Sequence, residues 1–142
     1  SLYKINDEVK LYLNVPLNNL LQLMATSKIL LHPTLEEPFG ISIAEGMSAG
    51  LIPIVPFKGG NTEFVPKQFH YKTEEEAVKI IINAMNISYN DRLKISKFAD
   101  VFSITNFKNS LKIIVQDLIE REVALSSHQI KSNNIKKHTK FN

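Results

Sequence analysis

The sequence predicts an α/β fold in which a Rossmann-like parallel sheet is flanked by helices. Short apolar runs typical of strands alternate with helix-like segments through the first half of the chain, and the second half is mostly helical. One run, over residues 29–31, is wholly apolar, as in a strand that is covered on both faces. Helical segments separate the strand-like runs, which favours parallel strands joined by crossovers.

Length and composition are those of one globular domain. The chain has 142 residues, of which 44% are hydrophobic and 22% charged. The absence of cysteine excludes a disulfide framework and a thiolate metal site. No apolar run approaches the roughly 20 residues that span a bilayer, and no signal peptide is evident. Because the chain opens with Ser1 and runs at once into a strand-like segment, we expect a fragment.

The first part of the chain is predicted to form a strand, a helix and a second strand. Apolar and polar residues alternate over 9–15, which is the period of a strand. Pro16 suits the start of the helix that follows. Residues 29–31 then form the next strand. The helix has an apolar stripe with spacings of three and four: Leu17, Leu20, Leu21 and Met24.

The middle of the chain continues the alternation. We expect a helix over 42–49, and Gly50 is a residue that commonly ends a helix. A third strand is predicted over 52–55, and a weaker fourth over 69–71.

Three further helices complete the prediction. Thr73 and Glu76 form a capping box at the start of the first. The second is predicted over 91–101, and the third begins from a cap at Thr105 or Asn106. The last helix repeats apolar residues at helical spacing: Leu111, Ile114, Val115, Leu118 and Ile119.

Charge divides the chain into a body and a tail. Residues 126–142 contain four lysines and no acid, whereas all 14 acidic residues precede them, so the body is close to neutral. We therefore expect a folded domain over 1–125 and a basic, disordered tail over 126–142. A neutral body argues against nucleic-acid binding. The expected location is cytoplasmic, with attraction of the tail to anionic lipid at a membrane face as an alternative.

One strand–loop–helix junction is the candidate site. Glu37 and Glu45 lie on either side of Gly40, where an apolar strand turns into a helix. Gly40 lets a ligand approach the main chain, and the unpaired amides of Ile41 and Ser42 favour an anion. Carboxylates accept hydrogen bonds from neighbouring hydroxyls. Phosphate beside hydroxyls is the chemistry of a nucleotide sugar.

A second glycine turn is expected beside the first. The loop over 33–40 and the turn over 58–62 each follow a predicted strand, and the carboxyl ends of parallel strands meet at one edge of a sheet. Gly59 and Gly60 therefore become candidates to line the same crevice. The plainer alternative is a short turn that is capped by Asn61 or Thr62.

Plainer alternatives exist for the other residues too. Gly40 would then serve only a tight turn. Glu37 would be a solvated acid in a loop. Glu45 is either buried for ligand binding or lies on the exposed edge of its helix. A carboxylate pair also fits glycoside hydrolysis, although a hydrolase has no need of the neighbouring amides. His32 is expected to be structural, and Glu36 is the more exposed loop acid.

Residues 32–65 resemble the donor-binding half of retaining glycosyltransferases of the GT-B architecture. That group has two glutamates around a Phe-Gly pair, a helix of small residues, a Pro-Ile/Val strand and a Gly-Gly turn that ends in an acid. A weaker resemblance, through residues 14–16, Leu20 and His32, is to enzymes that elongate the mannose core of dolichol-linked oligosaccharides. The matching residues are Glu37, Phe39, Gly40, Glu45, Ala49, Gly50, Pro53, Ile54, Val55, Gly59, Gly60 and Glu63.

The resemblance implies roles for these residues. Glu45 would hold the ribose hydroxyls, and Glu37, the implied catalytic residue, would bind the transferred sugar near its 3-hydroxyl. The amides around Phe39, Gly40 and Ile41 would touch sugar or phosphate. Transfer would retain configuration by front-face departure of the diphosphate, with no metal and no cofactor beyond the nucleotide sugar.

The resemblance also implies substrates and partners. A hexose, expected to be mannose, would pass from GDP-mannose or a UDP-sugar to a glycan or lipid-linked acceptor. The chain would be the C-terminal half-domain of a GT-B enzyme, incomplete at its N-terminus and without the acceptor domain. An arginine and a lysine that grip the diphosphate in this group are not found, so the isolated chain is expected to be inactive. The alternative is a non-catalytic nucleotide-sugar-binding or interaction module.

Overall fold

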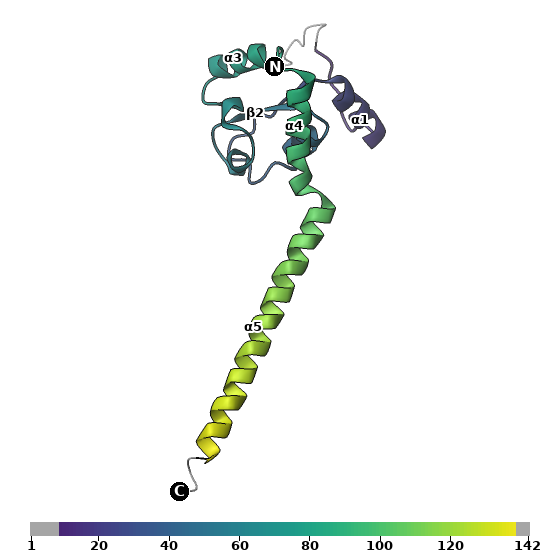
Figure 1. Cartoon of the computed structure of the whole chain (residues 1–142). Helices are drawn as coiled ribbons and strands as arrows, with labels where there is room; N and C mark the ends of the chain where they lie inside the picture. Colours follow the sequence, from purple (N-terminus) through teal and green to yellow (C-terminus); the bar gives the residue numbers. More distant parts are fainter. Residues whose placement is uncertain (1–8, 139–142) are drawn as a thin grey trace. The chain divides into compact units, whose positions relative to one another are not determined.

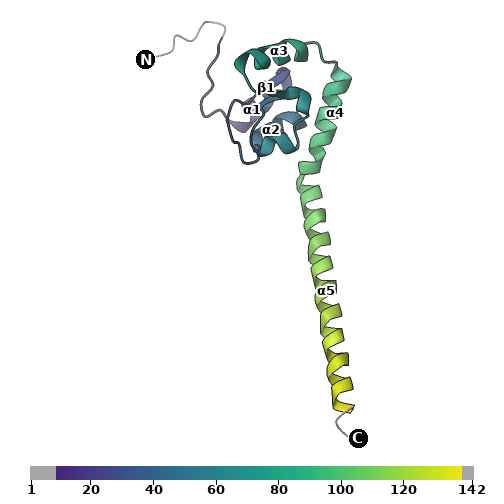
Figure 2. The same cartoon turned by 90° about the vertical axis from the view of Figure 1, so that its left-hand side faces the viewer.

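The computed structural model describes the backbone of residues 9–138. The chain forms two compact units, of which the first extends to Ala99 and the second begins at Asp100. The folded domain predicted over 1–125 extends beyond this boundary. Figures 1 and 2 show helices α1 to α4 gathered around a short sheet in the first unit.

A parallel sheet of three strands lies at the centre of the first unit. It comprises β1 (Ile29–Leu31), β2 (Ile52–Pro56) and β3 (His70–Tyr71) in the order β1-β2-β3. Leu30 pairs with Pro53 and Val55 with His70, both in parallel register. Every residue of β2 is buried, as expected for a central strand that helices cover. The predicted parallel α/β fold is confirmed.

The segment over residues 9–15 corrects one prediction. It has the alternating pattern of a strand, yet the structure assigns no strand there. Val9, Leu11 and Leu13 are 58%, 67% and 73% exposed. Alternation describes a surface that suits a sheet, but a strand forms only where a neighbouring strand supplies hydrogen-bond partners and a layer covers its apolar face.

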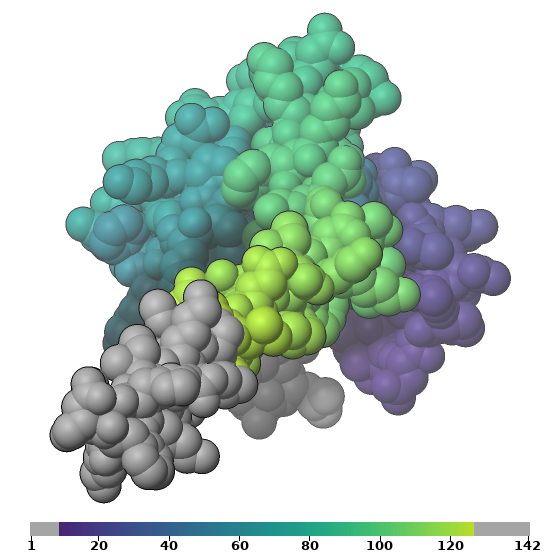
Figure 3. Space-filling model, turned by 60° about the horizontal axis from the view of Figure 1, so that its bottom comes forward, coloured from purple at the N-terminus to yellow at the C-terminus, as the bar shows by residue number. Residues whose placement is uncertain are grey.

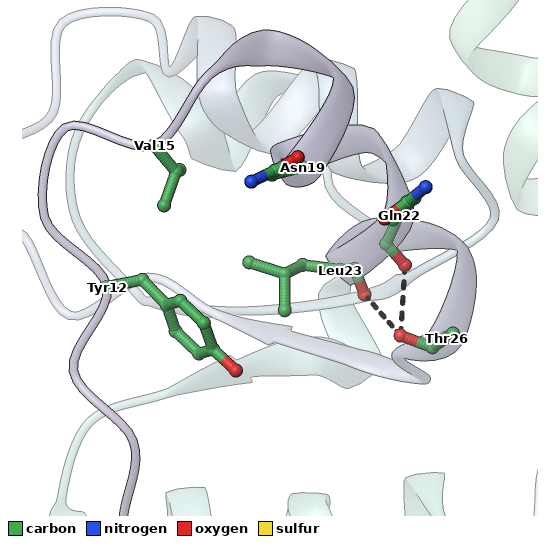
Figure 4. A pocket seen from close by; sticks show the side chains of 6 residues that line it. All are labelled: Tyr12, Val15, Asn19, Gln22, Leu23 and Thr26. Atoms are coloured by element: carbon green, nitrogen blue, oxygen red, sulfur yellow. Dashed lines mark hydrogen bonds between the residues drawn. The ribbon is translucent and has the colours of Figure 1, made fainter.

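Helix α1 (Leu17–Thr26) follows Pro16, as predicted. A cavity of about 360 Å³ lies between this helix and the irregular segment before it, with Tyr12 and Val15 on one side (Figure 4). In the last turn of the helix, the Thr26 hydroxyl donates to the carbonyls of Gln22 and Leu23 at 2.9 and 3.2 Å. The other lining residues are Asn19, Gln22 and Leu23 of α1.

Helix α2 (Ile41–Ser48) connects β1 to β2 and supplies much of the core. Its Ile43 and Met47 are fully buried, together with Ile52 of β2. The helix ends as predicted at Gly50, whose amide donates to the Met47 carbonyl at 2.8 Å. The core therefore lies directly beneath the junction that carries the candidate site.

Helices α3 (Glu74–Ala84) and α4 (Tyr89–Ala99) complete the first unit. The Thr73 hydroxyl accepts a hydrogen bond from the Glu76 amide at 3.3 Å, which confirms the predicted cap. Arg92 of α4 donates from Nε to the Gly50 carbonyl at 2.8 Å, so α4 is tied to the end of α2. In the space-filling view of Figure 3, green atoms of α4 lie against the teal atoms beside them.

The second unit comprises a short 3-10 helix, η3 (Asp100–Phe102), and α5 (Ile104–His138). Ser103 caps α5, because its hydroxyl accepts a hydrogen bond from the Asn106 amide at 3.3 Å. The expected cap at Thr105 or Asn106 is therefore wrong by two or three positions.

Helix α5 also differs from the expected tail. Its backbone is helical to His138, whereas disorder was expected from residue 126. No glycine or proline interrupts this segment, so nothing in its backbone chemistry ends the helix. The residues after His138 lie outside the described part of the chain. Among the described residues, no helix is long and apolar enough to cross a membrane.

Candidate functional site

Two loops meet at the carboxyl edge of the sheet, as the strand order predicts. Glu37, after β1, forms an isolated parallel bridge with Gly59, after β2. The Glu37 carbonyl accepts a hydrogen bond from the Gly60 amide at 2.7 Å. A Cβ atom at Gly60 would lie only 1.9 Å from the Pro38 carbonyl oxygen, so a side chain there is excluded. The two glycines thus allow two main chains to touch, which fixes the loop that carries Glu37.

Gly40 forms the junction between that loop and α2. It is the N-cap of the helix and has φ of 94°, in the left-handed region that glycine adopts at no steric cost. Its carbonyl accepts hydrogen bonds from the amides of Ile43 and Ala44 at 2.9 and 3.1 Å. Within the described chain, the amides of Ile41 and Ser42 have no protein acceptor. These two donors are available to an anion at the positive end of the helix.

The side chain of Glu37 folds back toward the sheet. Its Oε2 lies 3.2 Å from Nε2 of His32, and the two side chains are 23% and 19% exposed. Its Cγ lies 3.3 Å from the position that a Cβ of Gly40 would occupy. The structural role expected for His32 does not include this contact with Glu37. The available signal was the position of His32 directly after a buried strand, at the ligand-binding edge of the sheet.

Glu45 lies on the exposed edge of α2, so the alternative in which it is buried for ligand binding is wrong. Ile41, Ser42 and Ser48 are exposed with it and share its side of the helix at spacings of three and four. The acid therefore belongs to a solvent-facing stripe that begins at the two free amides. A ligand bound at those amides can extend along this stripe toward Glu45.

An ion pair joins the same two loops at their surface. Lys58, directly before Gly59, contacts the carboxylate of Glu36, directly before Glu37. The hydrogen bond and the charge of Lys58 lower the pKa of Glu36 below its usual value. Both side chains are exposed, so the ion pair contributes little to stability. Lys58 carries the positive charge nearest the glycine turn, and Glu36 is its partner.

Two further residues, Phe39 and Asn61, tie the loops of the site to the rest of the unit. The Phe39 ring lies 5.2 Å, between centroids, from the ring of Phe64, and so joins the loop to the segment after the glycine turn. Asn61 is fully buried, and its Nδ2 is 3.5 Å from the Pro56 carbonyl oxygen. Its Oδ1 has no hydrogen-bond partner among the residues that the structure describes. A buried asparagine in a turn of exposed residue types could not be recognised from the sequence.

The arrangement of two glutamates, a free helix N-terminus and a double-glycine turn agrees with a comparison against known protein families. Residues 1–101 match the family described as Glycosyl transferases group 1. The chain belongs to the group 1 glycosyl transferases. The match includes every residue of the candidate site, from His32 to Phe64.

A curated relative adds a narrower similarity for this glycosyl transferase chain. It is named "GDP-Man:Man(3)GlcNAc(2)-PP-Dol alpha-1,2-mannosyltransferase" and comes from Dictyostelium discoideum. The two are 27% identical over 137 residues, which is 92% of this chain and 27% of the relative. The group 1 glycosyl transferase chain thus spans about a quarter of the length of that relative.

Proposed function

We propose that this chain is the donor-binding part of a retaining hexosyltransferase that uses a nucleotide sugar. The preferred donor is GDP-mannose, with UDP-sugars as competitors, and the acceptor is a glycan or lipid-linked glycan. Membership of the group 1 glycosyl transferases supports sugar transfer, and the named activity of the Dictyostelium relative supports mannose and a dolichol-linked acceptor.

The observation that carries this proposal is the pair of free amides at the start of α2. Among the described residues, the N–H groups of Ile41 and Ser42 have no protein acceptor, and they follow Gly40, whose left-handed backbone starts the helix. A helix N-terminus contributes about 0.3–1 kcal/mol to anion binding on an exposed surface. In a site from which water is excluded, such fixed donors stabilise negative charge more strongly.

The two glutamates recognise the sugar portions of the donor. Glu37 accepts hydrogen bonds from the hydroxyls of the transferred hexose, close to the carbon that reacts. Glu45, on the exposed stripe of α2, accepts hydrogen bonds from the ribose hydroxyls. A carboxylate suits both tasks because its two oxygens can accept from neighbouring hydroxyls together.

The physical task in transfer is to stabilise the departing diphosphate. As the bond from the sugar to phosphate breaks, negative charge grows on the phosphate oxygen, and the free amides of α2 stabilise it. Donors that are already oriented need no reorganisation when the charge forms. We propose that the chain uses these donors and needs neither a metal nor a further cofactor, so EDTA will leave donor binding unchanged.

Calorimetry with the purified chain tests the proposal. We expect GDP-mannose to bind, and Glu45→Gln to weaken its affinity about tenfold, the loss of roughly 1.4 kcal/mol of hydrogen bonding to ribose. The matched control is Glu122→Gln, an exposed acid on α5, which should bind like the parent. Equal affinity of Glu45→Gln and the parent would contradict the role of Glu45, and no binding of GDP-mannose or UDP-glucose would contradict the site.

A non-catalytic binding module is the second candidate. The ion pair between Lys58 and Glu36 favours it, because the lysine nearest the glycine turn is already neutralised and does not offer a free cation to the diphosphate. We therefore expect the isolated chain to bind the donor without useful turnover. A radiolabelled transfer assay with a lipid-linked mannose acceptor checks this, and robust product would exclude the module.

A further inference from the structure

We propose that His32 is a positioning residue that holds the carboxylate of Glu37 in the orientation required for the sugar. This inference rests on the proposed role of Glu37 in donor binding. It assigns to the histidine a function that acts through the glutamate, without contact to the donor itself.

The backbone of His32 is fixed to the sheet, and its side chain contacts Glu37. It directly follows β1, and its amide donates to the Ile54 carbonyl of β2 at 3.0 Å, which continues the parallel pairing of the two strands. Its side chain is only 19% exposed. The imidazole therefore starts from a backbone that is hydrogen-bonded to the wholly buried strand β2.

Glu37 is held at three points, and His32 supplies the one that orients its charge. The Gly60 amide fixes its carbonyl at 2.7 Å. Gly40 leaves room for its Cγ, which lies where a Cβ of residue 40 would be crowded. Nε2 of His32 then meets Oε2 at 3.2 Å, while Oε1 has no partner among the described residues. One oxygen is thus engaged by protein and the other is left for a hydroxyl.

The terminal torsion of a glutamate is broad, so a carboxylate without a partner samples many orientations. A single hydrogen bond from a rigid donor removes much of this freedom before the ligand binds, and preorganisation of this kind favours affinity. Nε2 donates in one neutral tautomer of histidine and in the imidazolium. The geometry therefore requires a proton on Nε2.

Binding of two ligands separates a positioning role from a structural one. We expect His32→Leu, which removes the donor at similar size, to weaken GDP-mannose about three- to tenfold while leaving GDP unchanged, because only the sugar contacts Glu37. His32→Gln keeps a side-chain N–H and should recover most of the affinity. In a Glu37→Gln background, His32→Leu should have no further effect on GDP-mannose.

Each outcome of these titrations has a consequence. If the parent binds none of GDP-mannose, GDP and UDP-glucose, the proposed function fails and this inference fails with it. If the parent binds GDP-mannose and His32→Leu binds it equally well, only the positioning role is overturned. An equal loss for GDP-mannose and GDP shows a merely structural histidine and also overturns it.

A ligand-free measurement covers the case in which His32→Leu does not fold. Nitrogen NMR of the parent, labelled at histidine, should show a proton on Nε2 of His32, and Glu37→Gln should move the chemical shift of that nitrogen. Thermal unfolding of Glu37→Gln identifies whether it is folded. The proposal is overturned if Nε2 of His32 carries no proton. It is also overturned if the Nε2 chemical shift is the same in the parent and in folded Glu37→Gln.

Discussion

Gly60 is the residue at which two loops of the site come closest. Its amide reaches the carbonyl of Glu37, and a Cβ atom would lie 1.9 Å from the carbonyl oxygen of Pro38. The Cβ atom and the Pro38 carbonyl oxygen are both attached directly to the main chain. Neither atom could move away unless its loop moved. The glycine at this position is therefore required by the approach of the main chains as much as by any ligand.

We expect Gly60→Ala to lower the free energy of unfolding by more than about 2 kcal/mol, because the clash must shift a loop. Gly50→Ala is the matched comparison: it also replaces a glycine, with φ of 80°, but its Cβ would find no atom closer than 4.0 Å. That change should cost about 1 kcal/mol through backbone strain alone. Urea denaturation measures both, and equal losses would show that the loops do not meet as described.

His70 is the residue through which pH should affect stability. Partial burial lowers its pKa, the positive charge of Lys67 adds to this, and its hydrogen bond to the Val65 carbonyl opposes it. Its other nitrogen, Nδ1, is buried and has no partner in the described part of the chain, so a proton there would be unsatisfied. Protonation is therefore less favourable in the folded chain than in the unfolded one.

The direction of the pH effect follows from this difference. Because the unfolded state binds a proton at about pH 6.5 and the folded state only at lower pH, His70 destabilises the fold as pH falls below about 6.5. His70→Gln keeps a side-chain N–H but does not titrate. We expect the stability advantage of the parent over this variant to shrink between pH 8 and pH 5. A constant difference in urea midpoints across this range would contradict the assignment.

Among the elements, α2 depends on α4 for its position. Arg92 donates from Nε to the Gly50 carbonyl at 2.8 Å and from Nη2 to the Ser27 carbonyl at 3.2 Å. The first bond satisfies a carbonyl just beyond the end of α2, and the second ties down the segment between α1 and β1. The guanidinium thus fixes the far end of the helix whose start carries the candidate site.

We expect Arg92→Met to lower the free energy of unfolding by about 1–3 kcal/mol, since it retains the apolar stem but leaves two carbonyls without their charged donor. Arg121→Met is the control, because Arg121 makes an exposed ion pair with Asp117 within α5. Its cost should stay within about 0.5 kcal/mol. Thermal unfolding compares the two variants. Similar losses of stability would show that Arg92 does not anchor α2.

At the scale of elements, local patterns predicted the helices better than the strands. The helix after Pro16, the Thr73 cap and the helix end at Gly50 are each indicated by residues within one or two turns, and each was found. The apolar stripe predicted for α1 is not buried, because Leu17 and Leu21 are 68% and 52% exposed. The segment over 9–15 has strand periodicity without strand structure, because a strand requires partners distant in sequence.

For the whole molecule, the first unit contains the buried apolar core. Every buried apolar residue in the described chain lies between Ile43 and Ala99, and α5 is exposed throughout residues 104–126. The apolar stripe predicted for α5 is present in sequence, yet Leu111 and Leu118 are 49% and 55% exposed. A helical period indicates which residues share a face, but burial requires an opposing surface.

We therefore expect a chain that ends at Ser103 to remain folded, with a melting temperature within a few degrees of the full chain. A chain that ends at Ser88 is the comparison: it lacks α4, including Arg92 and the buried Ala99, and should lose cooperative unfolding. Circular dichroism during heating distinguishes the two. Loss of cooperative unfolding in the longer truncation would show that the first unit needs α5.

By itself, the sequence determined the α/β class, the order of most elements and the meeting of two glycine-bearing loops at one edge of the sheet. These follow from local periodicity, local capping and the fixed geometry of parallel strands. Only the tertiary structure decided that residues 9–15 form no strand, that Glu45 is exposed and that His32 contacts Glu37. Those outcomes depend on which surfaces meet across the fold, and neither side-chain spacing nor residue type specifies such contacts.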